Sequence, residues 1–237
     1  MKNKKLIGFI ELIRREKNVK IEHLCEGLCT QGFYSKILSG EKNPGELLVN
    51  LILGRLGIAK DYYESYMSYA DYIGYKMRCD IIVAIENENV NDAIINTQKY
   101  KKEIGKTSCL HERFILQAEA GIMTIEGASD DKICEKLKRA VLITIPRFEK
   151  TELGKLILSP EELFLTAEYA SFEEKVKGHG TSQKIYEQII DYMDSTEFDN
   201  IAKSKIYPKV VCLLSAKYLK NKEYKKNINK TQIQDNK

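Results

Sequence analysis

A short stretch after residue 29 carries side chains suited to reading the edges of DNA bases. Gln31 can pair bidentately with adenine, Phe33 can contact the methyl group of thymine, and Lys36 can reach guanine or a phosphate. Other short or basic residues around them can contact the sugar-phosphate backbone. The candidate DNA-binding residues are therefore Lys20, Thr30, Gln31, Gly32, Phe33, Ser35, Lys36, Lys42 and Asn43.

The residue types that usually carry catalysis or bind metals show no telling arrangement. His23, His111 and His179 lack a nucleophile or carboxylate at a suggestive spacing, and no P-loop, GxSxG or dinucleotide-binding glycine motif occurs. Cys25 and Cys29 stand four residues apart, but free cysteine usually behaves as a small buried hydrophobe, and we expect that role for both. The sequence predicts a protein that is not an enzyme and binds no cofactor or metal.

A helix is the element that can bring the polar stretch to DNA, because a helix fits the major groove and presents its first turn to the bases. Thr30 is suited to cap the start of such a helix, Gly40 to end it, and Pro44 with Gly45 to open the next one. The segment Lys20–Gly40 is therefore predicted to form a helix, a tight turn and a second helix. Apolar residues at helical spacing predict four short helices, around Leu6–Ile13, Ile21–Cys25, Tyr34–Ile37 and Leu47–Ile52.

Length and composition favour a large helical protein with a basic N-terminal part. The 237 residues are 43% hydrophobic and 30% charged, and only 4 Pro and 14 Gly interrupt them. No run of about 18 uncharged apolar residues is present, so we expect a cytoplasmic protein without a signal peptide or membrane contact. Residues 1–60 carry eleven Lys and Arg against six Glu, net +5, whereas the whole chain carries +4, which leaves −1 for the rest. This asymmetry predicts a polyanionic partner for the N-terminal part.

Beyond residue 60 the pattern is one amphipathic helix after another, without strand alternation. Short connectors between the helices predict antiparallel pairs stacked into an α-solenoid, with pairs beginning near residues 76, 110, 160 and 208. The expected domains are 1–60, 61–222 and a polar tail at 223–237, in an all-α fold. The expected helices are Asp61–Tyr75, Lys76–Asn87, Val90–Lys102, Leu110–Gly127, Asp130–Thr144, Pro160–Val176, Ser182–Met193 and Pro208–Tyr218.

The stretch from Leu24 to Gly40 resembles the helix-turn-helix of the phage-repressor or XRE type. Its short turn is similar to that of the peptide-pheromone regulators, the PlcR- and Rgg-like group called RRNPP. The resemblance extends to about Lys222 through landmarks of the tetratricopeptide-like repeats of that group. These landmarks are Arg55-Leu56-Gly57-Ile58, Ala140 to Pro146, Leu158 to Leu163 and Ile206 to Lys209.

The resemblance implies a transcription regulator that senses a short signalling peptide on the concave face of its repeats. Residues of the types that hold such a peptide are Asn96, Gln98, Tyr100, Arg113, Gln117, Tyr169 and Tyr186. One position departs from the family pattern, because Leu38 stands where an acid usually pairs with an arginine of the first helix. Either Arg14 or Arg15 would then be free to bind phosphate, or the head would be less stable than those of its relatives.

We also expect a homodimer on double-stranded DNA, because one head contacts only a half-site. The apolar residues of the last helix, Tyr207 to Tyr218, are expected to be partly uncovered and to supply part of the dimer surface. Two other functions stay open. An antitoxin-type repressor would use the same head but respond to a protein partner, and a scaffold protein would use the repeats alone.

Overall fold

The N-terminal part forms the four short helices that the sequence predicts, in a computed structural model that describes residues 3–59, 68–104, 108–178 and 180–222. These helices are α1 (Asn3–Glu16), α2 (Ile21–Cys25), α3 (Gln31–Ser39) and α4 (Glu46–Arg55), and we call them the head. The Thr30 hydroxyl accepts a hydrogen bond from the Phe33 N–H at 3.1 Å, which caps α3. Gly40 ends the helix in the left-handed conformation at φ 82°.

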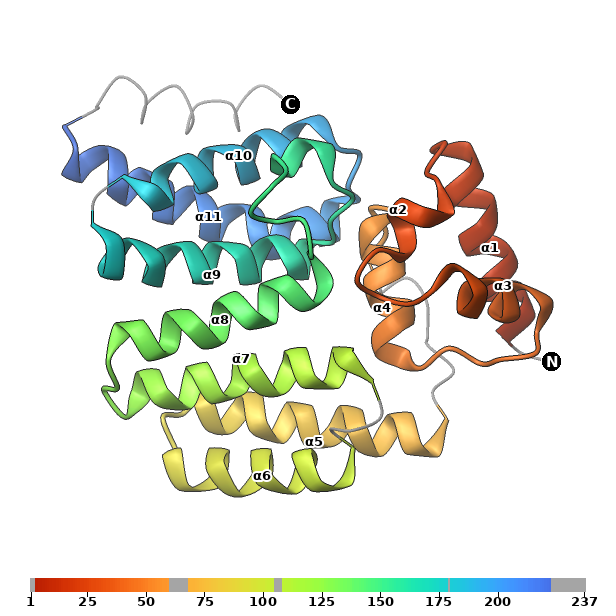
Figure 1. Ribbon diagram of the computed structural model, residues 1–237, viewed down its shortest axis with the longest axis horizontal. Coiled ribbons are helices and arrows are strands. Elements are labelled where there is room, and N and C mark those ends of the chain that lie inside the picture. The colour runs from red at the N-terminus through yellow and green to blue at the C-terminus, as the bar shows by residue number, and fades with distance from the viewer. Residues whose placement is uncertain (1–2, 60–67, 105–107, 179, 223–237) are drawn as a thin grey trace.

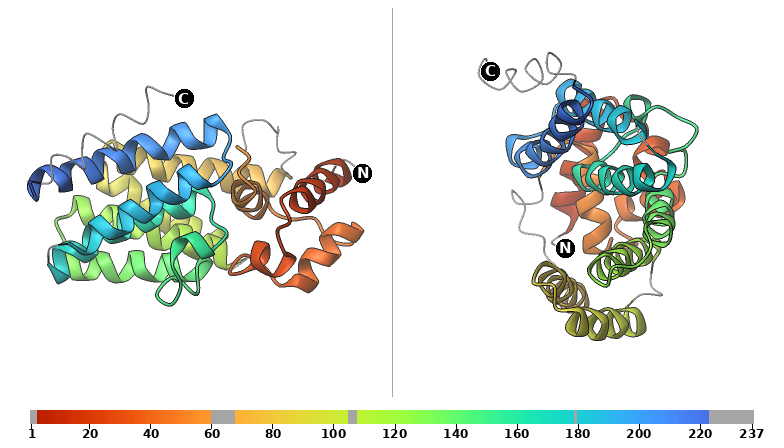
Figure 2. Two further views of the ribbon diagram at one scale, coloured as in Figure 1. Left: turned by 90° about the horizontal axis from the view of Figure 1, so that it is seen from above. Right: turned by 90° about the vertical axis from the view of Figure 1, so that its left-hand side faces the viewer.

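The remaining helices stack into the solenoid, which we call the body (Figure 1). Direct contacts join α5 to α7 and α9 to α11, so the odd-numbered helices form one layer and the even-numbered helices the other. Figure 2 (right) shows these helices nearly end on, following an arc with the odd-numbered layer on its inner side. The helices are α5 (Tyr69–Glu86), α6 (Val90–Glu103), α7 (Cys109–Ile125), α8 (Asp130–Thr144), α9 (Pro160–Lys177), α10 (Thr181–Ser195) and α11 (Asn200–Lys220), with a 3₁₀ turn at Leu153–Lys155.

Two expected helix boundaries are wrong. The break expected between residues 75 and 76 does not exist, because α5 runs unbroken from a Ser68–Asp71 capping box to Glu86. Residues 60–67, which hold the start of the expected Asp61–Tyr75 helix and the expected domain boundary, lie outside the described residues, as does the expected tail at 223–237. The last helix begins at Asn200 rather than at Pro208, because Asp199 caps it by accepting the Ala202 N–H at 2.7 Å. Pro208 lies within this helix with its ring exposed to solvent.

The expectation that the last helix leaves its apolar residues uncovered is also wrong. Tyr207, Val210, Leu214 and Tyr218 are all less than 7% exposed, because α11 packs on both α9 and α10 of the same chain. Only Val211 and Leu213 of the expected set are half-buried. This apolar face therefore closes the core of the body and offers no dimer surface.

None of the helices in the described part of the chain is long and apolar enough to cross a membrane.

Candidate nucleic-acid interface

Helix α3 has one exposed polar side and one buried apolar side. Gln31 and Lys36 are exposed and Phe33 is half-buried, whereas Tyr34 and Ile37 on the opposite face are 1% and 2% exposed. A Cβ built on Gly32 would meet no atom within 4 Å, so the space in front of the first turn is open. Figure 1 shows α1 and α3 on the side of the head away from the body. The space in front of Gly32 is therefore open, while Gln31 at the start of α3 lines a cleft that it shares with Arg147 of the body.

The remaining candidates for DNA contact surround this turn at the surface. Lys20, at the start of α2, and Lys42 with Asn43, just after α3, are exposed. The Lys42 N–H donates to the Lys36 carbonyl at 3.1 Å, which folds the residues after Gly40 back along the helix. The Ser35 hydroxyl is exposed and donates to the Gln31 carbonyl at 3.0 Å. The set predicted from the sequence thus lies around one helix end, and its role in DNA binding stays a prediction.

Arg14 is not free for phosphate, contrary to the expectation from Leu38. Its guanidinium binds the Glu11 carboxylate through Nε at 2.8 Å and Nη2 at 2.6 Å, and Nη1 donates to the Val19 carbonyl. The more exposed Arg15 binds the same carboxylate through Nε at 2.8 Å. These hydrogen bonds, that from Arg14 above all, lower the pKa of Glu11 to about 2 although burial opposes them. Glu11, an acid one turn away on the same helix, replaces the acid expected at position 38.

Three candidates for peptide contact are buried and cannot line an open surface. Tyr100 and Tyr186 are 0% exposed and Tyr169 is 2% exposed. The Tyr100 hydroxyl is bonded to Arg78 Nη1 at 3.2 Å and to His111 Nδ1 at 2.5 Å, so it belongs to an internal polar cluster. Helical periodicity marks the apolar face of a helix, but it does not show which tyrosines use their hydroxyl inside the protein.

Of the other candidates, only Arg113 and Gln117 lie in the layer of odd-numbered helices, whereas Asn96 and Gln98 lie on α6 in the other layer. Gln117 Nε2 donates to the Glu168 carboxylate of α9 at 2.8 Å, and Arg113 donates to the Glu161 carbonyl at 3.3 Å. Burial raises the pKa of Glu168 and lowers that of Arg113.

The Phe164 ring of α9 lies nearby. Lys209 Nζ of α11 stands 4.9 Å from the centroid of this ring. Glu168, Phe164 and Lys209 were missed because their side chains meet only across helices far apart in the sequence. We call the five residues Arg113, Gln117, Phe164, Glu168 and Lys209 the inner-face cluster.

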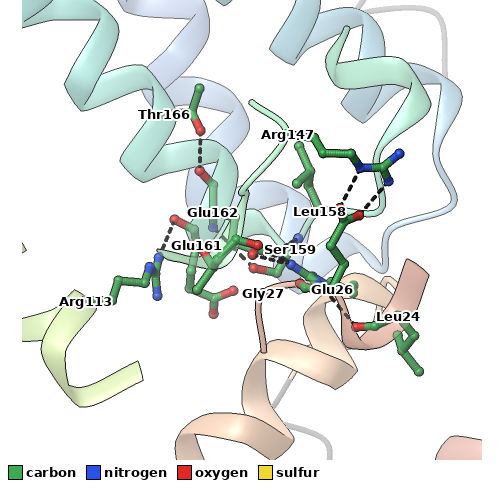
Figure 3. A network of polar contacts seen from close by, with 12 residues as sticks. Leu24, Glu26, Gly27, Arg113, Arg147, Leu158, Ser159, Glu161, Glu162 and Thr166 are labelled. Atoms are coloured by element: carbon green, nitrogen blue, oxygen red, sulfur yellow. Dashed lines mark hydrogen bonds and ion pairs between the residues drawn. The ribbon is translucent and has the colours of Figure 1, made fainter. Parts of the chain in front are cut away.

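A buried ion pair joins the head to the body (Figure 3). Arg55, the last residue of α4, donates through Nε at 3.0 Å and Nη2 at 2.7 Å to Glu162 near the start of α9. Its remaining N–H groups donate to the carbonyls of Leu24 and Glu26 in the head and of Thr144 in the body, at 2.8 to 2.9 Å. Burial raises the pKa of Glu162, but the Arg55 charge and hydrogen bonds outweigh it and hold that pKa below its usual value. The guanidinium is thus fully occupied.

A second ion pair fixes the other end of α4, and here the head supplies the carboxylate and the body supplies the guanidinium. The Glu46 carboxylate of the head binds the Arg78 guanidinium of α5, and both side chains are less than 9% exposed. Helix α4 is therefore bonded at its start to α5 and at its end to α9, so the head is fixed to two separate repeats of the body. Two of the family landmarks, Arg55 to Ile58 and Leu158 to Leu163, meet at this junction. The sequence shows both segments, but it does not show that they touch.

The described residues hold no group of three or more His, Cys, Asp or Glu side chains placed to bind a metal ion.

Comparison with known proteins finds no matching family model and no matching curated protein. One solved structure is similar in fold: the crystal structure of Bacillus thuringiensis PlcR in complex with the peptide PapR7 and DNA. The TM-score is 0.52 at 16% identity, over 95% of this chain and 76% of that one. The likeness confirms the predicted all-α fold, a helix-turn-helix head followed by a body of helical repeats.

Proposed function

We propose that the protein is a sequence-specific DNA-binding transcription regulator. The observation that carries the proposal is the exposed face of α3, where the Gln31 amide stands at the helix start and the Lys36 ammonium group lies in the last turn. Free N–H groups at a helix N-terminus favour phosphate, and the Gln31 side chain has the two donor and acceptor atoms that pair with adenine. The excess of positive charge in residues 1–60 supplies the attraction to the duplex.

The same proposal includes a dimer and a peptide ligand. A single head reads one half-site, so two copies are needed for a pseudo-palindromic operator. A short peptide would bind across the inner-face cluster, where an amide, a carboxylate, two cations and an aromatic ring lie on neighbouring helices. PlcR, whose fold is similar, was solved with both a peptide and DNA bound, which supports this assignment.

A scaffold protein would not need the polar groups at the start of α3, and this difference provides the test. We expect Gln31→Ala to cost about 1–3 kcal/mol of binding free energy on one specific duplex and to relax the preference at one base pair. Lys20→Ala should weaken all duplexes alike and reduce the dependence of log K on log salt by about one. Fluorescence anisotropy on specific and random duplexes at several salt concentrations measures both effects.

Gln31 and Lys20 are both exposed in the head, and among the described residues neither side chain forms a hydrogen bond or ion pair, so each variant serves as a folding control for the other. If Gln31→Ala lost the same affinity on specific and random DNA, α3 would not be the reading helix. If neither variant changed binding, a scaffold protein, which uses the repeats alone, would be the better account.

A further inference from the structure

Two cysteines lie at the ends of the turn that leads into the reading helix. The Cys29 N–H donates to the Cys25 carbonyl at 3.0 Å across residues 26–28, where Gly27 is left-handed at φ 72° and the chain is not helical. Both side chains line one cleft, and each thiol shifts the pKa of the other. The two thiols are therefore near neighbours, and a disulfide between them needs only a local movement of the turn.

The surroundings of Cys29 favour its thiolate. The hydrogen bond from Cys25 lowers the pKa of Cys29 against the opposing effect of burial, and the Arg55 guanidinium lowers it further. Arg55 is held beside the turn by its hydrogen bonds to the Leu24 and Glu26 carbonyls. A thiolate with a neighbouring thiol is the arrangement that reacts with peroxides and then closes a disulfide.

An oxidant can reach this pair from solvent. An open cleft of about 380 Å³ is lined by both cysteines together with His23, Gln31 and Arg147. Cys29 is half-buried, whereas Cys25 is 1% exposed and reachable only through its neighbour. Cys29 would therefore react first and Cys25 second.

We propose that Cys25 and Cys29 form a reversible disulfide when the protein meets hydrogen peroxide, and that this disulfide weakens DNA binding. The Cys29 thiolate attacks one peroxide oxygen, the O–O bond breaks, and the sulfur becomes a sulfenic acid while water leaves after protonation. The Cys25 thiol then attacks that sulfur, the S–O bond breaks, and a second water leaves. Two thiols are oxidised by one peroxide, and a dithiol reductant restores them.

The effect on DNA follows from the position of the pair and rests on the proposed function. Cys29 directly precedes Thr30, whose hydroxyl caps α3, and Cys25 is fixed in the core of the head. A disulfide holds its two sulfur atoms about 2.05 Å apart, so closing it draws Cys29 toward the end of α2. The Thr30 cap and the first turn of α3 must shift with it, which moves Gln31 away from the position it takes on DNA.

The test uses the full chain and hydrogen peroxide as the probe. Intact mass should fall by two hydrogen atoms, peptide mapping should join Cys25 to Cys29, and dithiothreitol should reverse both changes. Affinity for a duplex recovered from a random pool by the reduced protein should fall about tenfold on oxidation, the size of effect that follows from a lost helix cap. Cys29→Ser should keep its affinity in peroxide, whereas the matched control Cys212→Ser, exposed on α11, should respond as the unchanged protein does.

Each of the other possible outcomes would contradict one part of the disulfide proposal. Cys109, whose sulfur lies 4.0 Å from the Gly27 carbonyl, is the competing partner, and a bond mapped to Cys29 and Cys109 would refute the pair. Oxidation of both cysteines to separate sulfenic or sulfinic acids would do the same. A mapped Cys25–Cys29 disulfide with unchanged affinity would refute its effect on DNA. If the reduced protein recovered no duplex, the proposed function would fail, while the mass measurement would still decide the thiol chemistry.

Discussion

Arg55→Ala is expected to lower the free energy of unfolding by about 3–5 kcal/mol, since removal of one partner leaves a buried charge uncompensated. The charge left without its partner is that of the Glu162 carboxylate, which is 0% exposed. The carbonyls of Leu24 and Thr144 would lose their donor in the same step. Urea denaturation followed by circular dichroism measures the loss.

Arg147→Ala is the matched control, because Arg147 also joins the body to the head through a bidentate ion pair with Glu26 at 2.5 Å. That pair lies at the surface, with the arginine side chain 44% exposed, so solvent screens it and only a small loss is expected. Similar losses for both variants would contradict the assignment of the buried pair as the main tie between head and body.

The Arg55 variant should also respond to pH in a defined direction. In the unchanged protein the pKa of Glu162 is lowered, so its stabilisation is present above the unfolded pKa and is lost as pH falls. Without Arg55, burial would raise the pKa of Glu162. Protonation at acid pH would then neutralise the carboxylate and remove the cost of its buried charge. The difference in stability between the two proteins should therefore shrink as pH falls from 7 toward 4.

Gly27→Ala should destabilise the protein by about 1–3 kcal/mol more than Gly127→Ala, because a methyl group at position 27 overpacks the junction. Both glycines have a left-handed backbone, with φ 72° and 70°, so both variants carry the same local strain. A Cβ at Gly27 would overlap the Thr144 carbonyl at the end of α8, whereas one at Gly127 meets nothing within 4 Å.

Thermal unfolding of the two glycine variants isolates this close approach, because the strain cancels in the comparison. Equal shifts in melting temperature would show that Gly27 does not pack closely against Thr144 of the body in solution.

Local signals made the head predictable from its sequence. The Thr30 cap, the Gly40 stop and the Pro44-Gly45 opening each act within a few residues, and the structure contains all of them. Helix α8 has the predicted bounds, with two acidic residues, Asp130 and Asp131, in its first turn and Pro146 soon after its end. Local rules failed at Pro208, where the Asp199 cap nine residues earlier and packing on α9 and α10 outweigh the preference of proline for a helix start.

The sites depend on contacts that no local rule predicts. Arg55 and Glu162 are 107 residues apart, and Gln117 and Glu168 are 51 apart. An isolated arginine at a helix end indicates a surface charge as readily as a buried one, so the junction could not be derived from spacing. Glu11, by contrast, lies three residues before Arg14, and this pair was open to prediction from helical geometry.

If α3 reads a specific DNA sequence, as proposed, the whole chain should select that sequence from a pool of random duplexes. We expect enrichment of a pseudo-palindrome whose half-sites lie about one or more helical turns apart, and Gln31→Ala should change the preferred base at one position in each half. Enrichment of no sequence, with retention that merely falls as salt rises, would contradict the claim and leave only nonspecific attraction between a basic head and DNA.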